Sequence, residues 1–166
     1  MKRRSPPRDT ATTRTDDSDP ISNRELCHRF LDAYQPGRLD ALLELLHPRI
    51  EWSTTETWVE REVWYGHSGV RRGMERFYAE WESFSNDLLL EFRDGADRFA
   101  VVTRMRGRTR RTGIGTEMVT AGVLEVRDGL IVRITGYADP AAALRAVAAD
   151  DRNEPAETPQ QEAPRR

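Results

Sequence analysis

Three side chains of this sequence are candidates for proton transfer to or from a substrate. His67 lies in a predicted loop beside Trp64 and Tyr65 and is the best placed of the histidines. Glu51 lies in a short predicted strand, and Asp139 precedes a predicted closing helix. A histidine or carboxylate at the edge of a pocket can act as a general acid or base. His67, Glu51 and Asp139 are therefore our candidate catalytic residues, with an ordinary surface histidine as the favoured alternative for His67.

Metal chemistry finds no support in the sequence. Cys27 and His28 are adjacent in a predicted helix, where neighbouring residues point to different faces. No other cluster has the spacing of a zinc site, so we predict neither a metal nor a cofactor. Cys27 is the single cysteine. It excludes an intrachain disulfide and is consistent with a reducing cytoplasm, where we expect the protein to reside.

Aromatic residues form the second notable group. All four tryptophans fall between residues 52 and 81. Aromatic side chains offer a large apolar contact area together with a polar handle on Tyr and Trp. We predict that they line a pocket for a flat hydrophobic molecule of polyketide, terpenoid or steroid type, with ordinary core packing as the alternative. The predicted lining comprises Phe30, Tyr34, Trp52, Trp58, Trp64, Tyr65, Phe77, Trp81 and Tyr137.

Hydrophobic periodicity predicts the elements that position these residues. Helical spacing follows the cap residue Ser22 and ends at Pro36, and a second short helix covers 39–46. Ser68 is the predicted cap of a third helix that carries Trp81 on its apolar face. Asp139 caps the closing helix, which begins at Pro140. Strands are predicted at 50–52, 87–93, 98–108, 117–127 and 130–138.

This order of elements predicts an α+β domain. Helices come first and hairpin-linked strands follow, which favours a curved antiparallel sheet wrapped by the N-terminal helices around a pocket. The polar segments 1–20 and 150–166 cannot bury enough apolar surface to fold, so we expect two disordered tails around one domain at 21–149. No apolar run approaches the roughly 18 residues of a membrane span, and we expect no membrane partner.

Three segments of this predicted domain resemble SnoaL-like proteins of the NTF2-like superfamily. They are 37–52 (GRLDALLELLHPRIEW), 65–71 (YGHSGVR) and 127–134 (RDGLIVRI), and they occur in the family's order. The resemblance implies a cone-shaped fold around a pocket and a homodimer formed through the sheet. The superfamily includes ketosteroid isomerases, polyketide cyclases, limonene-epoxide hydrolases and non-catalytic members, so the fold does not by itself assign a reaction.

Several catalytic positions implied by this resemblance hold residues that cannot perform the chemistry. The carboxylate base of the isomerases falls on Trp52, and their tyrosine donor falls on Phe30. A histidine of many family members is replaced by Gly122. The arginines that could belong to a hydrolase set, Arg104 and Arg106, have no aspartate among them, with Glu117 and Asp139 the nearest carboxylates. We expect both arginines to lie on the outer face of the sheet, paired with Glu117 or Glu125 or solvated.

Two hypotheses of function therefore remain. The first is a small-molecule-binding protein or an enzyme of cyclase, isomerase or hydrolase type, and it predicts an open pocket. The second is a dimeric structural or interaction protein, and it predicts a cavity filled by the chain's own aromatic side chains. Nucleic acid is not an expected partner, because the formal net charge is -2 and the basic run 104–111 is offset by acidic residues elsewhere.

Overall fold

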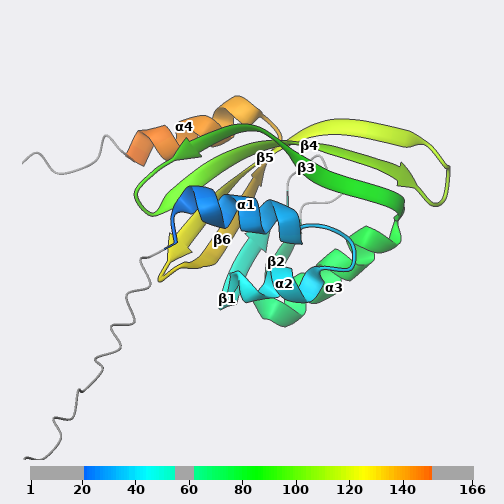
Figure 1. Cartoon of the computed structure of the whole chain (residues 1–166), viewed down its shortest axis with the longest axis horizontal. Coiled ribbons are helices and arrows are strands. Elements are labelled where there is room, and N and C mark those ends of the chain that lie inside the picture. The colour runs from blue at the N-terminus through cyan, green and yellow to red at the C-terminus, as the bar shows by residue number, and fades with distance from the viewer. Residues whose placement is uncertain (1–20, 55–61, 151–166) are drawn as a thin grey trace, which may run out of the picture.

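The computed structural model describes residues 21–54 and 62–150 (Figure 1). The predicted N-terminal tail, Trp58 and residues 151–166 lie outside the described residues. Four helices are present in the described part: α1 (Asn23–Ala33), α2 (Leu39–Glu44), α3 (Gly66–Ala79) and α4 (Pro140–Asp150). None of these helices is both long and apolar enough to cross a membrane.

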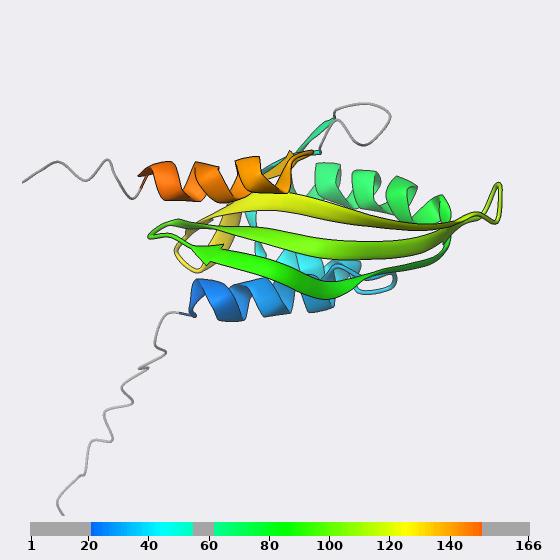
Figure 2. The same ribbon diagram turned by 90° about the horizontal axis from the view of Figure 1, so that it is seen from above.

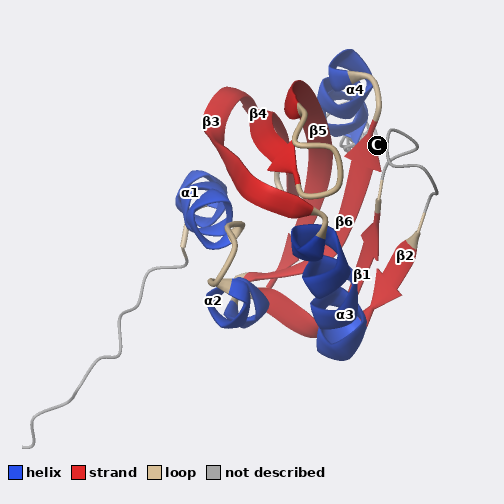
Figure 3. Cartoon of the chain, turned by 90° about the vertical axis from the view of Figure 1, so that its right-hand side faces the viewer, coloured by secondary structure: helices blue, strands red, loops and turns tan. Residues whose placement is uncertain are grey.

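Six strands form one sheet in the order β2-β1-β6-β5-β4-β3. Their bounds are β1 (Leu46–Ser53), β2 (Val63–Tyr65), β3 (Trp81–Asp94), β4 (Arg98–Thr109), β5 (Gly115–Arg127) and β6 (Leu130–Tyr137). All neighbouring pairs are antiparallel except β1 and β6, which pair in parallel. The sheet is thus mixed at this one pair, and Figure 3 shows it strongly curled. The predicted α+β cone is confirmed.

Two apolar layers cover opposite faces of the sheet. On β4, Phe99, Val101 and Met105 belong to the main core beneath α1, α2 and α3. The alternate residues Ala100 and Val102 pack with residues of α4 on the other face. Figures 1 and 2 show α4 separated from α1 by the sheet. Helices α1, α2 and α3 therefore pack on the concave face of the sheet, and α4 packs on the opposite face.

Local signals correctly predicted where the first and last helices begin. The Ser22 side chain accepts a hydrogen bond from the Glu25 backbone N–H, as a cap residue does. Asp139 accepts a hydrogen bond from the Ala141 backbone N–H at the start of α4. The turn between β5 and β6 places Asp128 and Gly129 at positive φ, 51° and 76°, as the sequence Asp-Gly predicts.

Three local predictions were wrong where tertiary contacts decided the conformation. Ser68 does not cap α3, because the helix already begins at Gly66 with Tyr65 at the cap position. The second helix ends at Glu44, and Leu46 starts β1, where an irregular register before Glu51 accommodates Pro48.

Trp81 is the third correction, because it begins β3 instead of lying on α3. It is paired in register with Thr109 of β4. Its ring occupies the space beside Gly107, where any Cβ would overlap it. Packing against a glycine of the neighbouring strand therefore outweighs the helical spacing that the sequence shows up to Trp81.

Candidate ligand cavity

A cavity of about 580 Å³ lies between the helices and the concave face of the sheet. Helices α1 and α3 supply one wall, and all six strands contribute to the others. Its lining is mostly apolar, with a minority of polar side chains. Six of the aromatic residues singled out in the sequence line it: Phe30, Tyr34, Trp52, Trp64, Phe77 and Trp81.

Tyr34 is the centre of the aromatic wall. Its ring centroid lies 5.7 Å from that of Phe30 and 5.8 Å from that of Trp52. On the other side it lies 5.9 Å from Phe84 and 6.4 Å from Phe77. Rings at these separations attract one another beyond simple burial. Residues from α1, β1, α3 and β3 are thereby held as one continuous apolar surface.

The other predicted pocket residues lie elsewhere in the fold. Tyr65 is 66% exposed and borders a separate outer hollow together with Trp64 and Arg76. Tyr137 packs against the small core under α4, on the opposite side of the sheet from α1. Neither residue lines the cavity.

The three candidate catalytic residues are not brought together. The ring Nε2 of His67 lies 2.8 Å from the Leu46 carbonyl oxygen. Glu51 lies 3.8 Å from Arg133. Asp139 caps α4 and lies 3.3 Å from Arg145. Each therefore has a structural partner, and none of the three lines the cavity.

The positions that correspond to catalytic groups in the resembled proteins do line this cavity. Phe30, Trp52 and Gly122 all contribute to its wall. A phenyl ring, an indole and a hydrogen atom supply no carboxylate or imidazole there. Tyr34, one helical turn after Phe30, brings a hydroxyl to the same wall. Burial raises the pKa of Tyr34 above its usual value, so this hydroxyl stays protonated and can donate a hydrogen bond.

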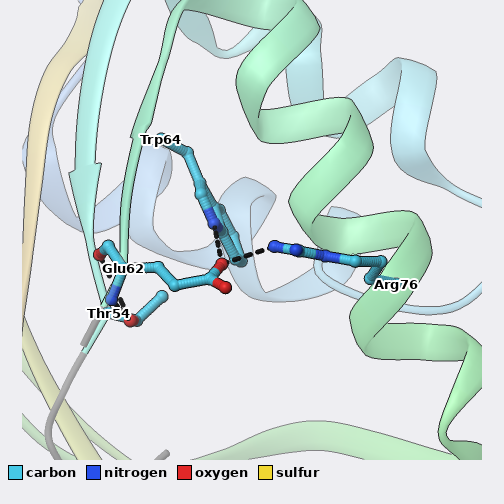
Figure 4. Close-up of polar contacts among 4 residues, drawn as sticks. All are labelled: Thr54, Glu62, Trp64 and Arg76. Carbon is cyan, nitrogen blue, oxygen red and sulfur yellow. Dashed lines mark hydrogen bonds and ion pairs between the residues drawn. The ribbon is translucent and has the colours of Figure 1, made fainter. Parts of the chain in front are cut away.

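A charged group contributes to the lining of the cavity, and Figure 4 shows its contacts. Glu62 Oε2 accepts a hydrogen bond of 2.7 Å from the Trp64 indole Nε1 and one of 2.5 Å from Arg76 Nη2. The Glu62 backbone N–H donates to Thr54 Oγ1 at 2.9 Å, which ties the start of β2 to the end of β1. Glu62, Trp64 and Arg76 all line the cavity.

Sequence reasoning missed Glu62 and Arg76, although the spacing contained a signal for each. Glu62 is two residues from Trp64, and residues two apart in a strand point to the same face. Arg76 shares a helical face with Gly73, Phe77 and Glu80, all of which line the cavity.

Neutral polar side chains line a second part of the cavity. Asn86 of β3, Thr103 of β4 and Thr120 of β5 lie on the concave face of the sheet. The hydroxyls of Thr103 and Thr120 are 2.9 Å apart and share a hydrogen bond. The sequence analysis missed these residues too, because Asn and Thr within strands carry no motif. Only the pairing of the strands brings them together.

The arginines of β4 lie outside the cavity. Arg104 and Arg106 approach Glu117 at 3.4 Å and 2.9 Å, which confirms the predicted pairing with Glu117. Within 21–54 and 62–150, no group of three or more His, Cys, Asp or Glu side chains is placed to hold a metal ion.

The part of the chain that forms the cavity matches a known protein family. The sequence profile of the SnoaL-like domain family matches residues 27–134. This span contains almost every residue that lines the cavity, and Gly136 lies just beyond it. None of the curated proteins matches the chain in sequence.

Solved structures show the same fold at low sequence identity. A protein from Xanthomonas campestris proposed to be a polyketide cyclase is 18% identical, with a TM-score of 0.61 over 75% of this chain and 95% of its own. An NTF2-like protein from Burkholderia pseudomallei is 18% identical, with a TM-score of 0.63 over 76% of this chain and 98% of its own. TerC, crystallised with polyporic acid, is 18% identical, with a TM-score of 0.62 over 76% of this chain and 98% of its own.

Proposed function

Because this chain belongs to the SnoaL-like domain family, we propose that it binds a small, flat, hydrophobic molecule in the cavity beneath α1 and α3. The observation that carries the proposal is the volume of about 580 Å³ that the aromatic side chains leave open. Pockets for small molecules typically measure about 300–1,000 Å³ and are mostly apolar. The alternative hypothesis of a structural or interaction protein predicts a cavity filled by the chain's own side chains, and such a cavity would not leave this space.

The proposed contact surface is the aromatic wall around Tyr34. Flat faces from Phe30, Trp52 and Trp64 suit a ligand with fused or linked rings. TerC, which has the same fold at 18% sequence identity, was crystallised with polyporic acid. This likeness of fold supports the proposal.

A reaction of cyclase, isomerase or hydrolase type is the second candidate function. The observation that favours it is the carboxylate of Glu62, which lines the cavity and accepts the hydrogen bonds from Trp64 and Arg76 on Oε2. Oε1 accepts none from the described residues and could act on a bound ligand as a base. If so, Glu62→Gln abolishes conversion of any bound compound, followed by mass spectrometry, and leaves its binding intact.

We also propose that the protein is a homodimer and resides in the cytoplasm. Leu90 and Val119 are large apolar residues that stay exposed, 42% and 47%, on long strands of the sheet. A partner chain on the sheet face would cover such residues. Light scattering of the purified protein tests the dimer, and fractionation of the host cell tests the location.

The decisive experiment is native mass spectrometry of protein purified from its own host. We expect a co-purifying hydrophobic molecule. Gly122→Leu places a side chain into the cavity and should release it, because Gly122 lines the wall from the middle of β5. Gly115→Leu makes the same change on the same strand at a residue outside the cavity, where an added Cβ meets no atom within 4 Å, and it is the matched control.

Absence of any bound molecule, together with no thermal shift across a panel of polyketide and terpenoid compounds, would contradict the proposal. If Gly122→Leu retained the molecule, its binding site would have to lie outside the cavity.

A further inference from the structure

Asn86, Thr103 and Thr120 form a polar strip across an otherwise apolar wall of the cavity. Thr103 and Thr120 are direct partners in the register of β4 and β5. Asn86 lies where β3 shifts register between its pairs Ser85↔Arg106 and Leu88↔Arg104, which places it across from Met105. Met105 and Thr103 are two residues apart and face the same side of β4. The three polar residues are therefore close neighbours on the concave face.

Two residues of the strip are buried, Thr120 is half-buried, and the hydrogen bonds of the strip are incomplete. Asn86 is 6% exposed and Thr103 is 3% exposed, and both line the cavity. Asn86 Oδ1 has no hydrogen-bond partner among the described residues. In the Thr103–Thr120 pair one hydroxyl donates to the other, so that bond leaves the accepting hydroxyl's own hydrogen unused. Buried polar groups are rarely left in this state unless another molecule completes them.

We propose that this strip binds the hydroxyl group of a flat hydrophobic ligand, a step that rests on the proposed function. An alcohol or phenol can donate its hydrogen to Asn86 Oδ1 and accept one from the threonine pair. A ketone or ether lacks the hydrogen for Asn86. A carboxylate accepts only, and its charge would meet no cation in the strip.

The strip therefore sets specificity within the cavity. A site built to hydrogen-bond a hydroxyl discriminates strongly against an analogue that lacks it, because its own polar groups are then left unpaired. The aromatic wall supplies affinity for the rings, and the strip selects for oxygenation at one end of the ligand. The charged pair Glu62–Arg76 is a separate polar part of the lining, supplied by the residue before β2 and by α3.

The test compares two probes of equal shape, 2-naphthol and 2-methylnaphthalene, by isothermal titration calorimetry on the full chain. We expect 2-naphthol to bind about tenfold more tightly, since two hydrogen bonds to buried partners are gained. Asn86→Leu and Thr103→Val each keep the side-chain volume and remove a polar group. Both should reduce the preference for 2-naphthol several-fold while leaving the affinity for 2-methylnaphthalene unchanged or higher.

Thermal unfolding of the same variants separates recognition from a structural role. Asn86→Leu removes an unpartnered buried acceptor, so we expect an equal or higher melting temperature without ligand. Thr116→Val is the control for Thr103→Val, because it makes the same type of substitution on β5 at a residue outside the cavity. It should leave the preference for 2-naphthol intact.

Each outcome bears on a different statement. Equal affinities for the two probes, or a preference that survives both Asn86→Leu and Thr103→Val, would overturn the hydroxyl subsite and leave the proposed function standing. A lower melting temperature of Asn86→Leu with an unchanged preference would assign Asn86 to the fold. Binding of neither probe to the unsubstituted chain would overturn both proposals.

Discussion

The indole ring of Trp64 lies in the space that a side chain at position 73 would need. A Cβ on Gly73 would overlap the six-membered ring of Trp64. The glycine thus lets the ring of a β2 residue lie directly against the middle of α3. Because Trp64 also lines the cavity and donates to Glu62, this contact fixes both the aromatic wall and the charged group beside it.

Gly73→Ala should destabilise the protein by about 1–3 kcal/mol, because the ring must move to make room for a methyl group. In an uncrowded helix the same change would stabilise by up to about 1 kcal/mol. Gly69→Ala provides this control in the same helix, since its Cβ would lie 3.5 Å or more from the atoms of Trp64. Urea denaturation measures both. An equal effect of the two substitutions would show that the Trp64 contact is unimportant.

The free energy of unfolding should depend more on Glu62 than on its ion-pair partner Arg76. Arg76 is largely exposed, so Arg76→Met should cost at most about 1 kcal/mol. Glu62→Ala also removes the acceptor of the Trp64 indole and should cost about 1–2 kcal/mol. Urea denaturation followed by tryptophan fluorescence compares them. Equal costs of the two substitutions would show that the hydrogen bond from Trp64 adds nothing to the ion pair.

The free energy of unfolding should fall at alkaline pH, because the buried thiol of Cys27 loses its proton more readily in the unfolded chain. Burial, partly offset by Arg24, raises the pKa of the Cys27 thiol to about 11 from 9.0. The unfolded chain then loses its proton at lower pH than the folded chain, so this stabilisation is complete below pH 9.0 and is lost as pH rises towards 11. Relative to Cys27→Ala, the unsubstituted chain should lose about 2 kcal/mol between pH 7 and pH 10.5. Urea denaturation across this range gives the difference, and a constant difference would contradict the shift.

Asp139 should matter for stability and not for the cavity. Its carboxylate caps α4 by accepting from the Ala141 backbone N–H at 3.0 Å. Asp139→Ala should therefore cost about 1 kcal/mol, whereas Asp139→Asn should retain most of the cap. Binding of 2-naphthol should be the same in both variants. A loss of binding in Asp139→Asn without a loss of stability would return Asp139 to the list of candidate site residues.

Local signals in the sequence predicted much of the fold. The caps Ser22 and Asp139, the turn at Asp128 and the alternation along β4 all depend on residues within a few positions of each other. The three segments that resemble SnoaL-like proteins all lie inside the span that the family profile matches. Helix α3 and strand β3 were less predictable at their junction, because Trp81 packs against Gly107, 26 residues further along the chain.

What the sequence determined by itself was the type of most elements, the α+β class and the aromatic character of the cavity, since periodicity and composition are local properties. The short strand β2 and the start of β3 at Trp81 were not predicted. Only the tertiary structure decided which polar groups share that cavity. Glu62 meets Arg76 across a strand and a helix, and Asn86 joins Thr103 and Thr120 through the register of three strands. Register depends on packing over the whole sheet, and for that reason the strip of Asn86, Thr103 and Thr120 could not be predicted from the order of residues.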